Sequence, residues 1–304
     1  MTELSQTVFN KYQIRKSNKQ KAEFIRYLQA QIPQFQVENG GFPKCRNLVL
    51  GNPDTAKIIL GAHYDTCARL PFPNFITPKR PLIAVGYSIL IIVPYLVAVL
   101  LLNLLLKQFS LTPDVHYLIS IVTYGLLMLL LLCGPANKHT ANDNTSGVIT
   151  LLELYQQMDP EERKNVCFVL FDNEEKGLLG SVHFRKKHKK AVKDALMVNF
   201  DCVSDGDHFL IAVSKKATQK HHVAIARTFT PTQKKQVMVE SLKKVYYPSD
   251  QAGFPQAIAV AALNYKKPFG YYMDRIHTKN DTIFQEENIR YLVEKTQQLI
   301  NTIN

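Results

Sequence analysis

The sequence predicts an α/β protein whose mostly parallel, mixed sheet is flanked by helices, with a transmembrane helical hairpin inserted into it. Short apolar runs alternate with stretches of helical spacing, a pattern typical of strands buried between layers of helices. Two long uncharged runs in the middle of the chain have the length and apolarity of membrane helices. The composition excludes collagen, coiled coils and disordered chains, because only 20% of the 304 residues are charged, with 13 Gly and 15 Pro.

The other elements follow one another in an alternating order. An amphipathic helical stretch is expected at 8–31, a second at 144–158 with Thr145 or Ser146 as its N-cap, and a last one at 287–301. Apolar runs predict buried strands at 57–62, 166–171, 196–200 and 209–213. Strands that alternate with helices in this way favour parallel pairing, with helices covering both faces of the sheet.

The predicted hairpin consists of residues 82–106 and 115–133, which contain no Asp, Glu, Lys or Arg. As helices these runs would extend roughly 37 and 29 Å, against a hydrocarbon core of about 30 Å. The alternative is a pair of helices buried inside a soluble core. On the membrane interpretation, 1–80 and 134–304 form one cytoplasmic domain, and 81–133 is the inserted hairpin.

The distribution of basic residues predicts the orientation of this hairpin. Arg69, Lys79, Arg80 and Lys138 flank it on the side of the large domain, whereas only Lys107 lies in the short turn. Because basic residues stay on the cytoplasmic side, we expect a multi-pass protein of the cell membrane whose large domain faces the cytoplasm. No apolar run marks a signal peptide at the N-terminus, and five scattered cysteines favour a reducing compartment.

Acidic and imidazole side chains follow the predicted strands at the points where the strands end. Ligand sites in open α/β sheets gather outside the carboxyl ends of strands, so we expect these side chains to converge. They are His63 and Asp65 after the first strand, Asp143 before a helix, Glu174 and Glu175 after the second strand, Asp201 after the third, and His277 near the C-terminus.

A cluster of this composition would repel itself unless cations were present. Five carboxylates facing two divalent ions carry a net charge of only −1, the sum of −5 and +4. Imidazole and carboxylate ligands without thiolate suit Zn²⁺, and less selectively Co²⁺ or Mn²⁺. The adjacent Glu174 and Glu175 point in different directions, so one can bind metal while the other remains free to move protons. The sequence therefore predicts two divalent metal ions, with zinc as the favoured element.

Six motifs in one order resemble the M28 family of co-catalytic dizinc aminopeptidases. They are GAHYDT (61–66), ANDNTSGV (141–148), FDNEEKGLLGS (171–181), NFD (199–201), SDQAGF (249–254) and IHTKNDT (276–282). The resemblance implies a zinc-exopeptidase-like fold. The related M20 peptidases do not fit, because only 75 residues separate Asp201 from His277, too few for their inserted lid domain.

The resemblance also implies a role for each residue. One metal would be held by His63 and Asp201, the other by Glu175 and His277, with Asp143 bridging both; Glu174 would be the general base, and Asp65 would orient His63. The partners implied are a peptide substrate and the lipid bilayer, without nucleic acid, and the oligomeric state stays open.

Two departures from the family pattern affect the expected site. The hairpin lies between His63 and Asp143, so the catalytic centre should lie near the membrane surface. Gln251 stands where relatives often have His, so the sequence does not fix which residues contact the substrate and its oxyanion. Tyr246 or Tyr247 is either an oxyanion donor or a packing residue. Cys67 and Cys202 lie beside predicted ligands but are expected to be structural, with Cys202 pointing away from Asp201.

Three classes of function remain open. The first, which the ligand pattern favours, is a membrane-tethered, metal-dependent, aminopeptidase-like hydrolase that cleaves peptide bonds. The second is another amide hydrolase or acyl transferase on the same scaffold, which would act only on N-acyl or cyclising substrates. The third is a membrane scaffold without catalysis, which the presence of every expected ligand and of the base disfavours.

Overall fold

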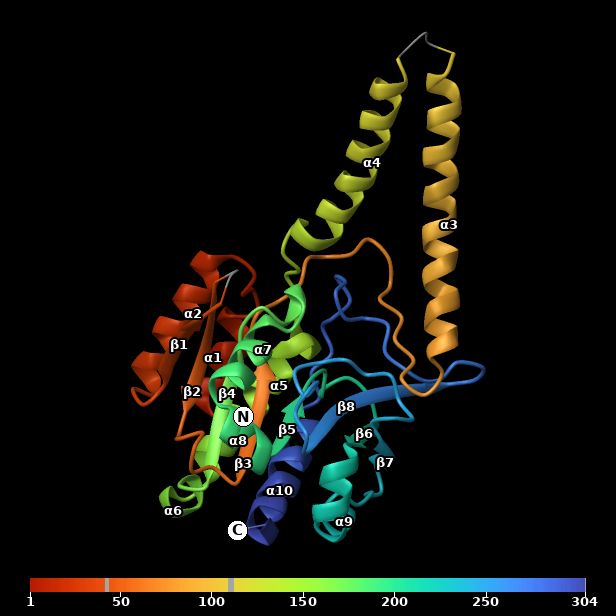
Figure 1. The fold of residues 1–304 in the computed structure, drawn as a ribbon. Coiled ribbons are helices and arrows are strands. Elements are labelled where there is room, and N and C mark those ends of the chain that lie inside the picture. The colour runs from red at the N-terminus through yellow and green to blue at the C-terminus, as the bar shows by residue number, and fades with distance from the viewer. Residues whose placement is uncertain (42–43, 109–111, 304) are drawn as a thin grey trace.

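A computed structural model describes residues 1–41, 44–108 and 112–303 of the chain (Figure 1). In chain order the strands are β1 (Gln36–Gly40), β2 (Cys45–Leu50), β3 (Ile58–His63), β4 (Val166–Phe171), β5 (Leu196–Phe200), β6 (His208–Val213), β7 (Gln236–Ser241), β8 (Ala257–Lys266) and β9 (Gly270–Tyr272). Among the described residues they form one sheet in the order β1-β2-β4-β3-β5-β8-β6-β7, with β9 paired to β8.

The centre of the sheet is parallel and its edges are mixed. Strands β4, β3, β5 and β8 run parallel, β2 is antiparallel to β4, and β6 is antiparallel to β8. All residues of β3, β4 and β5 are buried, as expected for strands covered on both faces. The predicted mixed α/β sheet is therefore confirmed, and the four predicted strands coincide with β3, β4, β5 and β6.

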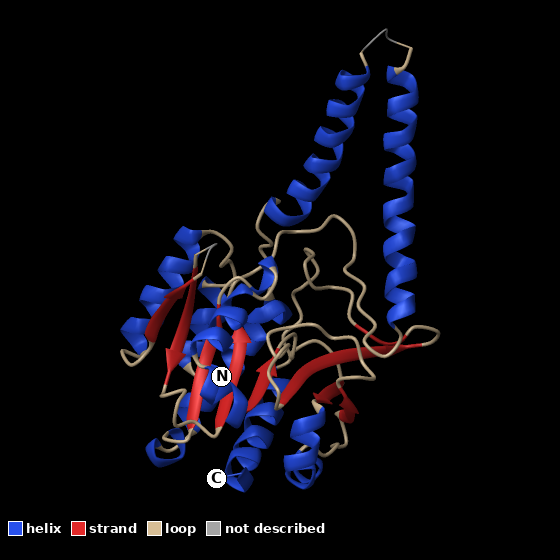
Figure 2. Cartoon of the chain, viewed as in Figure 1, coloured by secondary structure: helices blue, strands red, loops and turns tan. Residues whose placement is uncertain are grey.

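Helices cover both faces of this sheet (Figure 2). They are α1 (Glu3–Lys11), α2 (Asn18–Gln31), α5 (Gly147–Gln157), α6 (Pro160–Arg163), α7 (Leu179–Lys187), α8 (Lys189–Asp194), α9 (Lys215–Thr228) and α10 (Glu286–Ile303). The largest apolar cluster joins α1, α2, α5, α9 and α10 to one face, for example through Phe24, Leu152 and Leu292. A second cluster packs α7 and α8 on the other face through Phe184 and Val192.

Two predicted helices differ from the structure at their ends. The stretch 8–31 is two helices, because Ser17 caps α2 reciprocally with Gln20 and so starts a new helix. The helix expected at 144–158 begins only at Gly147. One of the two expected candidates, Ser146, occupies its N-cap position, but its side chain makes no capping hydrogen bond and donates to the Asn142 carbonyl instead. Thr145 accepts hydrogen bonds from Arg15. Residues Ala141–Ser146 are instead an irregular segment that carries Asp143. The helix predicted at 287–301 is confirmed as α10.

The two apolar runs form helices α3 (Pro81–Leu106) and α4 (Pro113–Cys133), which project away from the sheet as a hairpin (Figure 1). They touch through polar groups: the Ser120 hydroxyl donates to Asn103 Oδ1 at 2.7 Å, and the Tyr95 hydroxyl donates to the Thr123 carbonyl at 2.9 Å. Such internal pairing is what a bilayer demands of polar groups at membrane depth.

Helix α3 is long and apolar enough to cross a membrane, and only 6% of its most apolar window is buried. Leu82 and Leu90, for example, are 82% and 69% exposed, so α3 is not the buried core helix of the alternative interpretation. The side chains of 127–128 and 130–133 in α4 lie outside those described, so the second predicted span is established only as a helix. Crossing of a membrane by both helices stays a prediction.

Candidate metal centre and active-site pocket

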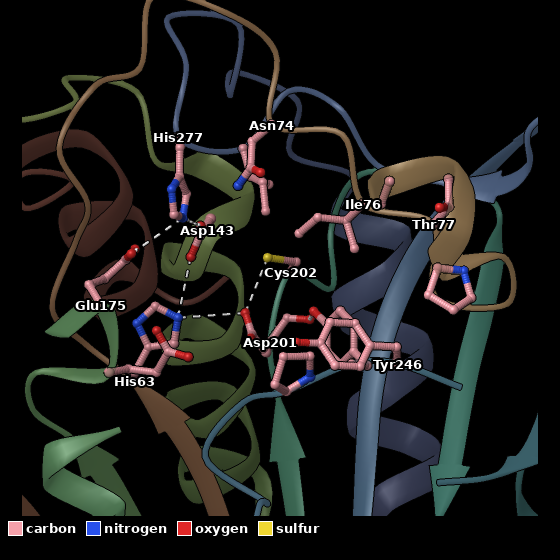
Figure 3. A pocket seen from close by; sticks show the side chains of 16 residues that line it. His63, Asn74, Ile76, Thr77, Asp143, Glu175, Asp201, Cys202, Tyr246 and His277 are labelled. Atoms are coloured by element: carbon pink, nitrogen blue, oxygen red, sulfur yellow. Dashed lines mark hydrogen bonds and ion pairs between the residues drawn. The ribbon is translucent and has the colours of Figure 1, made fainter. Parts of the chain in front are cut away.

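The carboxyl ends of three central strands deliver four of the predicted site residues. His63 is the last residue of β3, Glu174 and Glu175 lie in the short helical turn after β4, and Asp201 directly follows β5. Asp143 reaches the same place from the irregular segment before α5, and His277 from the loop after β9. Figure 3 shows the side chains of His63, Asp143, Glu175, Asp201 and His277 pointing toward one another at one side of a pocket.

The carboxylate of Asp143 lies between the two histidines. Its Oδ1 is 3.3 Å from His63 Nε2, and its Oδ2 is 2.9 Å from His277 Nε2. One carboxylate that presents a separate oxygen to each of two imidazoles has the geometry of a bridging ligand between two cations. Each histidine also faces a second carboxylate. Asp201 Oδ1 is 3.5 Å from His63 Nε2, and Glu175 Oε2 is 3.3 Å from His277 Nε2.

Three overlapping groups of potential ligand atoms follow from this arrangement, and in each group the atoms lie within 4.8 Å of one another. Two of them share Asp143: His63, Asp143 and Asp201 form one, and Asp143, Glu175, His277 and Cys67 form another. The third consists of His63, Glu174 and Glu175. The buried Oε1 of Glu175 has no hydrogen-bond partner among the described atoms, which leaves a ligand oxygen free for a cation. The residues present therefore fit two divalent ions that share Asp143.

The acidic and imidazole groups of this cluster shift one another's pKa values. Burial raises the pKa of Glu175 to about 8, since its charged form is poorly solvated there. Burial acts to lower the pKa of His277, but the neighbouring carboxylates of Glu175 and Asp143 raise it to about 9. Protons on Glu175 and His277 would therefore compete with a metal ion for the same atoms. Metal binding must displace these protons, as is general for imidazole ligands.

Asp65 holds both the first histidine and the acidic turn. Its backbone carbonyl lies 3.0 Å from His63 Nδ1, whereas its carboxylate Oδ1 is 3.7 Å from that nitrogen. The carboxylate accepts the backbone N–H of Glu174 at 2.9 Å and that of Glu175 at 3.3 Å. Asp65 therefore contacts the ring mainly through its carbonyl, while its side chain fixes the backbone of the two glutamates.

Backbone strain is concentrated beside these side chains. Asn173, Cys202 and His277 have positive φ angles of 56°, 56° and 61°, which are uncommon for residues other than glycine. Each lies at or next to a site residue, where strain is usually maintained because the surroundings over-determine it. The turn at Cys202 also explains an error in the sequence prediction. Because the strand alternation ends there, the Cys202 thiol points to Asp201 and donates to its Oδ1 at 3.1 Å.

Two supporting residues were missed by the sequence analysis. Asp281 accepts the backbone N–H groups of Asn142 and Asp143 at 2.8 and 3.0 Å, and so positions the bridging carboxylate. Lys21 on α2 pairs with Asp172 Oδ1 at 2.6 Å and donates to Asn173 Oδ1 at 2.8 Å, next to the two glutamates. Asp281 belongs to the IHTKNDT motif and could have been found there. Lys21 lies in a largely polar helical stretch and belongs to none of the motifs, so the sequence did not indicate its role.

Replacing Lys21 by Met is expected to destabilise the fold by about 3–5 kcal/mol, because it leaves the buried carboxylate of Asp172 without its cation. Both side chains of this ion pair are 1% exposed, and burial raises the pKa of Asp172 while Lys21 counteracts that rise. Chemical denaturation in detergent measures the change. Lys19→Met, at an exposed position of the same helix, is the matched control. Equal stability of the two variants would contradict the structural role of Lys21.

A pocket of about 230 Å³ opens beside the ligands. Its polar wall is formed by the clustered acids and histidines, and its other walls are mainly apolar: Ile76, Pro81, Ala84, Tyr246, Tyr247, Pro248 and Ile276. The buried Tyr247 donates its hydroxyl to the Asp201 carbonyl at 3.0 Å, so it supports the backbone there. Tyr246 is 65% exposed. Gln251 packs behind this wall, donating to the Tyr247 carbonyl and accepting from Asn199.

The mixed sheet, parallel at its centre, and the cluster of potential ligands at its carboxyl edge define an α/β protein with a candidate metal centre. Residues 125–299 match the model of peptidase family M28, and the chain belongs to this family. The predicted resemblance is thereby confirmed, and the chain is a member of a family of metal-dependent peptidases. No curated protein sequence matches the chain significantly.

Solved structures with low sequence identity share the fold. The aminopeptidase LapA of Legionella pneumophila is 13% identical with a TM-score of 0.57, and the match covers 99% of this chain and 68% of that chain. The glutaminyl cyclase of Porphyromonas gingivalis is 16% identical with a TM-score of 0.58, covering 98% and 95%. A Zn-dependent exopeptidase of Parabacteroides distasonis is 12% identical with a TM-score of 0.56, covering 98% and 96%.

Proposed function

We propose that the chain is an aminopeptidase-like hydrolase that cleaves peptide bonds with two divalent metal ions, most favourably Zn²⁺. The observation that carries the proposal is the position of Asp143, which offers one carboxylate oxygen to His63 and the other to His277. Asp201 would complete the first metal site and Glu175 the second. When bound, the two ions would lower the pKa of a shared water and polarise the scissile carbonyl.

Glu174 is the proposed general base. It lies close to His63 and Glu175, and burial raises the pKa of its carboxyl well above the usual range. A carboxylate beside the metal ligands can take a proton from the attacking water and pass it to the leaving amine. The hydrogen bond from its backbone N–H to the Asp65 carboxylate fixes the backbone of the turn that carries it.

Metal analysis of the detergent-purified chain, combined with a panel of substrates, tests this proposal. We expect two metal ions per chain, loss of activity with a chelator, and its recovery with Zn²⁺. Aminoacyl-nitroanilides and peptides with a free N-terminus should be cleaved, whereas the same peptides with an acetylated N-terminus should be poor substrates. Turnover of only N-acyl or cyclising substrates would instead indicate a different amide chemistry on this scaffold.

Tethering to the cell membrane, with the catalytic domain facing the cytoplasm, is the second part of the proposal. It is supported by the exposed apolar surface of α3 and by the basic residues that precede this helix. The chain should stay with membranes during extraction with alkaline carbonate. In a variant whose five native cysteines are replaced, a cysteine placed at Lys107 should be labelled only from outside the cell, and labelling from the cytoplasm would refute the orientation.

A further inference from the structure

The active-site pocket and the foot of the membrane-like helix share a wall. Pro81 and Ala84, in the first turn of α3, line the same pocket as His63 and Asp143. The Ile76 side chain, which precedes this helix, lies in the pocket on the side away from the histidines (Figure 3). The hairpin therefore contributes to the site itself, because the first turn of α3 forms part of the pocket wall.

This wall is held firmly to the catalytic domain. Ile76 forms a β-bridge with Met273, in which the Ile76 N–H donates to the Met273 carbonyl at 2.9 Å and the reverse bond is 3.0 Å. The N–H of Tyr246 donates to the Pro78 carbonyl at 2.9 Å. The Thr77 hydroxyl donates to the Arg80 carbonyl at 2.8 Å, directly before the helix. The start of α3 is thus fixed relative to the pocket.

Aromatic and basic residues gather around the foot of α3. Phe75 is surrounded by the rings of Tyr87, Phe269 and Tyr272, with centroids 5.1–5.6 Å away. Nearby, the basic side chains Lys79, Arg80 and Lys267 line a hollow between α3 and the β8–β9 turn. Tyrosines and basic residues gather at the headgroup level of membrane proteins, where anionic lipids attract them.

The basic residues at the start of α3 and the pocket residues on α3 lie close together along the helix. Arg80 and Ala84 are four residues apart, which corresponds to about 6 Å of helix rise. The exposed apolar surface begins at Leu82, which lies between the two pocket residues Pro81 and Ala84. A helix inserted at this level would hold the pocket about one turn from the headgroups.

We propose that the substrates of this site are peptides anchored in the same bilayer, with the scissile amide within a few residues of the lipid surface. The apolar part of such a substrate would lie against Ile76, Pro81 and Ala84, while its amide faces the metal ligands. The inference rests on the proposed peptidase function and the proposed membrane tethering, and it narrows the substrate class.

A set of lipid-anchored peptides measures how far the pocket lies from the bilayer surface. The full chain is placed in vesicles of phosphatidylcholine and phosphatidylglycerol, with peptides that share a free N-terminal leucine and a C-terminal diacyl anchor. Gly/Ser spacers of 4, 8 or 16 residues separate the two ends. A spacer of four residues reaches at most about 13 Å, so it can be cleaved only by a pocket close to the bilayer. For such a pocket the cleavage rate should fall about eightfold from 4 to 16 residues, since effective concentration declines with the −3/2 power of length.

A test variant and a control variant on α3 separate the possible outcomes. Ala84→Trp should reduce cleavage of the four-residue substrate more than that of a soluble peptide of the same sequence, whereas Ala98→Trp, higher on α3, should change neither. The inference would be overturned if the chain cleaved the soluble peptide but, among the anchored peptides, cleaved only the one with the 16-residue spacer. That result would leave the peptidase proposal intact. Failure to cleave any peptide, soluble or anchored, would overturn both.

Discussion

Glu174→Gln is expected to slow peptide hydrolysis by about 10²- to 10⁴-fold, the usual contribution of a general base, without loss of bound metal. The amide has nearly the same shape as the carboxylate but cannot accept the water proton. The Asp65 carboxylate binds the backbone N–H of residue 174, so the turn should keep its conformation in the variant. Steady-state kinetics on an aminoacyl-nitroanilide and elemental analysis of the same sample measure the two quantities.

Glu161→Gln is the matched control, because Glu161 lies on the exposed helix α6 and pairs only with Lys164 in the contacts described. It should have wild-type activity. A wild-type rate for Glu174→Gln would show that another group takes the proton. Joint loss of metal and activity would place Glu174 among the ligands rather than beside them, and the neighbouring Glu175 would then be the first candidate for the base.

The sequence was sufficient to predict the part of the fold that positions the site. Strands β3, β4 and β5 are continuous apolar runs because both faces are covered, and such runs are easily recognised. The polar residues that interrupt them, among them His63 and Asp201, lie at the carboxyl edge, where parallel strands end together. Knowledge of the strand ends was therefore enough to predict that His63, Glu174, Glu175 and Asp201 converge. Asp143 and His277 lie on loop segments, and their roles followed from the resemblance to the family motifs.

Other elements were missed for physical reasons. Strand β8 lies at the centre of the sheet, but its alanines have low β-propensity, and tertiary packing rather than local preference places it there. Strands β1, β2, β7 and β9 belong to the edges or to a short hairpin, where apolar patterning is weak. The buried ion pair of Lys21 with Asp172 joins residues that are far apart in the chain, so no local pattern could reveal it.

The contact between the hairpin and the pocket was foreseen only in outline. The position of the apolar runs between His63 and Asp143 predicted a catalytic centre near the foot of the hairpin. The sequence could not show that Pro81 and Ala84 line the pocket itself, because this depends on the bridge between Ile76 and Met273. Long-range backbone pairing of this kind leaves no periodic signal in either segment.

Asp143→Ala is expected to lower the metal content well below two ions per chain, and to abolish activity with it. Both proposed sites lose a ligand in this single variant, because Asp143 faces His63 with one oxygen and His277 with the other. Replacement of Asp201 or Glu175 should instead weaken mainly one site, since each lies against one histidine. Elemental analysis after gel filtration in metal-free buffer gives the stoichiometry of each variant.

Stabilisation by metal provides an independent measure of the same loss. A ligand that binds only the folded state raises its stability by RT ln(1 + [L]/Kd), so added Zn²⁺ should raise the Tm of the wild-type chain and that of Asp54→Ala, an exposed control. Asp143→Ala should show a much smaller rise, with an unchanged far-UV circular dichroism spectrum. Retention of two ions per chain and of the full Tm shift would exclude Asp143 as the bridge, and the two metals would then have to be held by separate ligand sets.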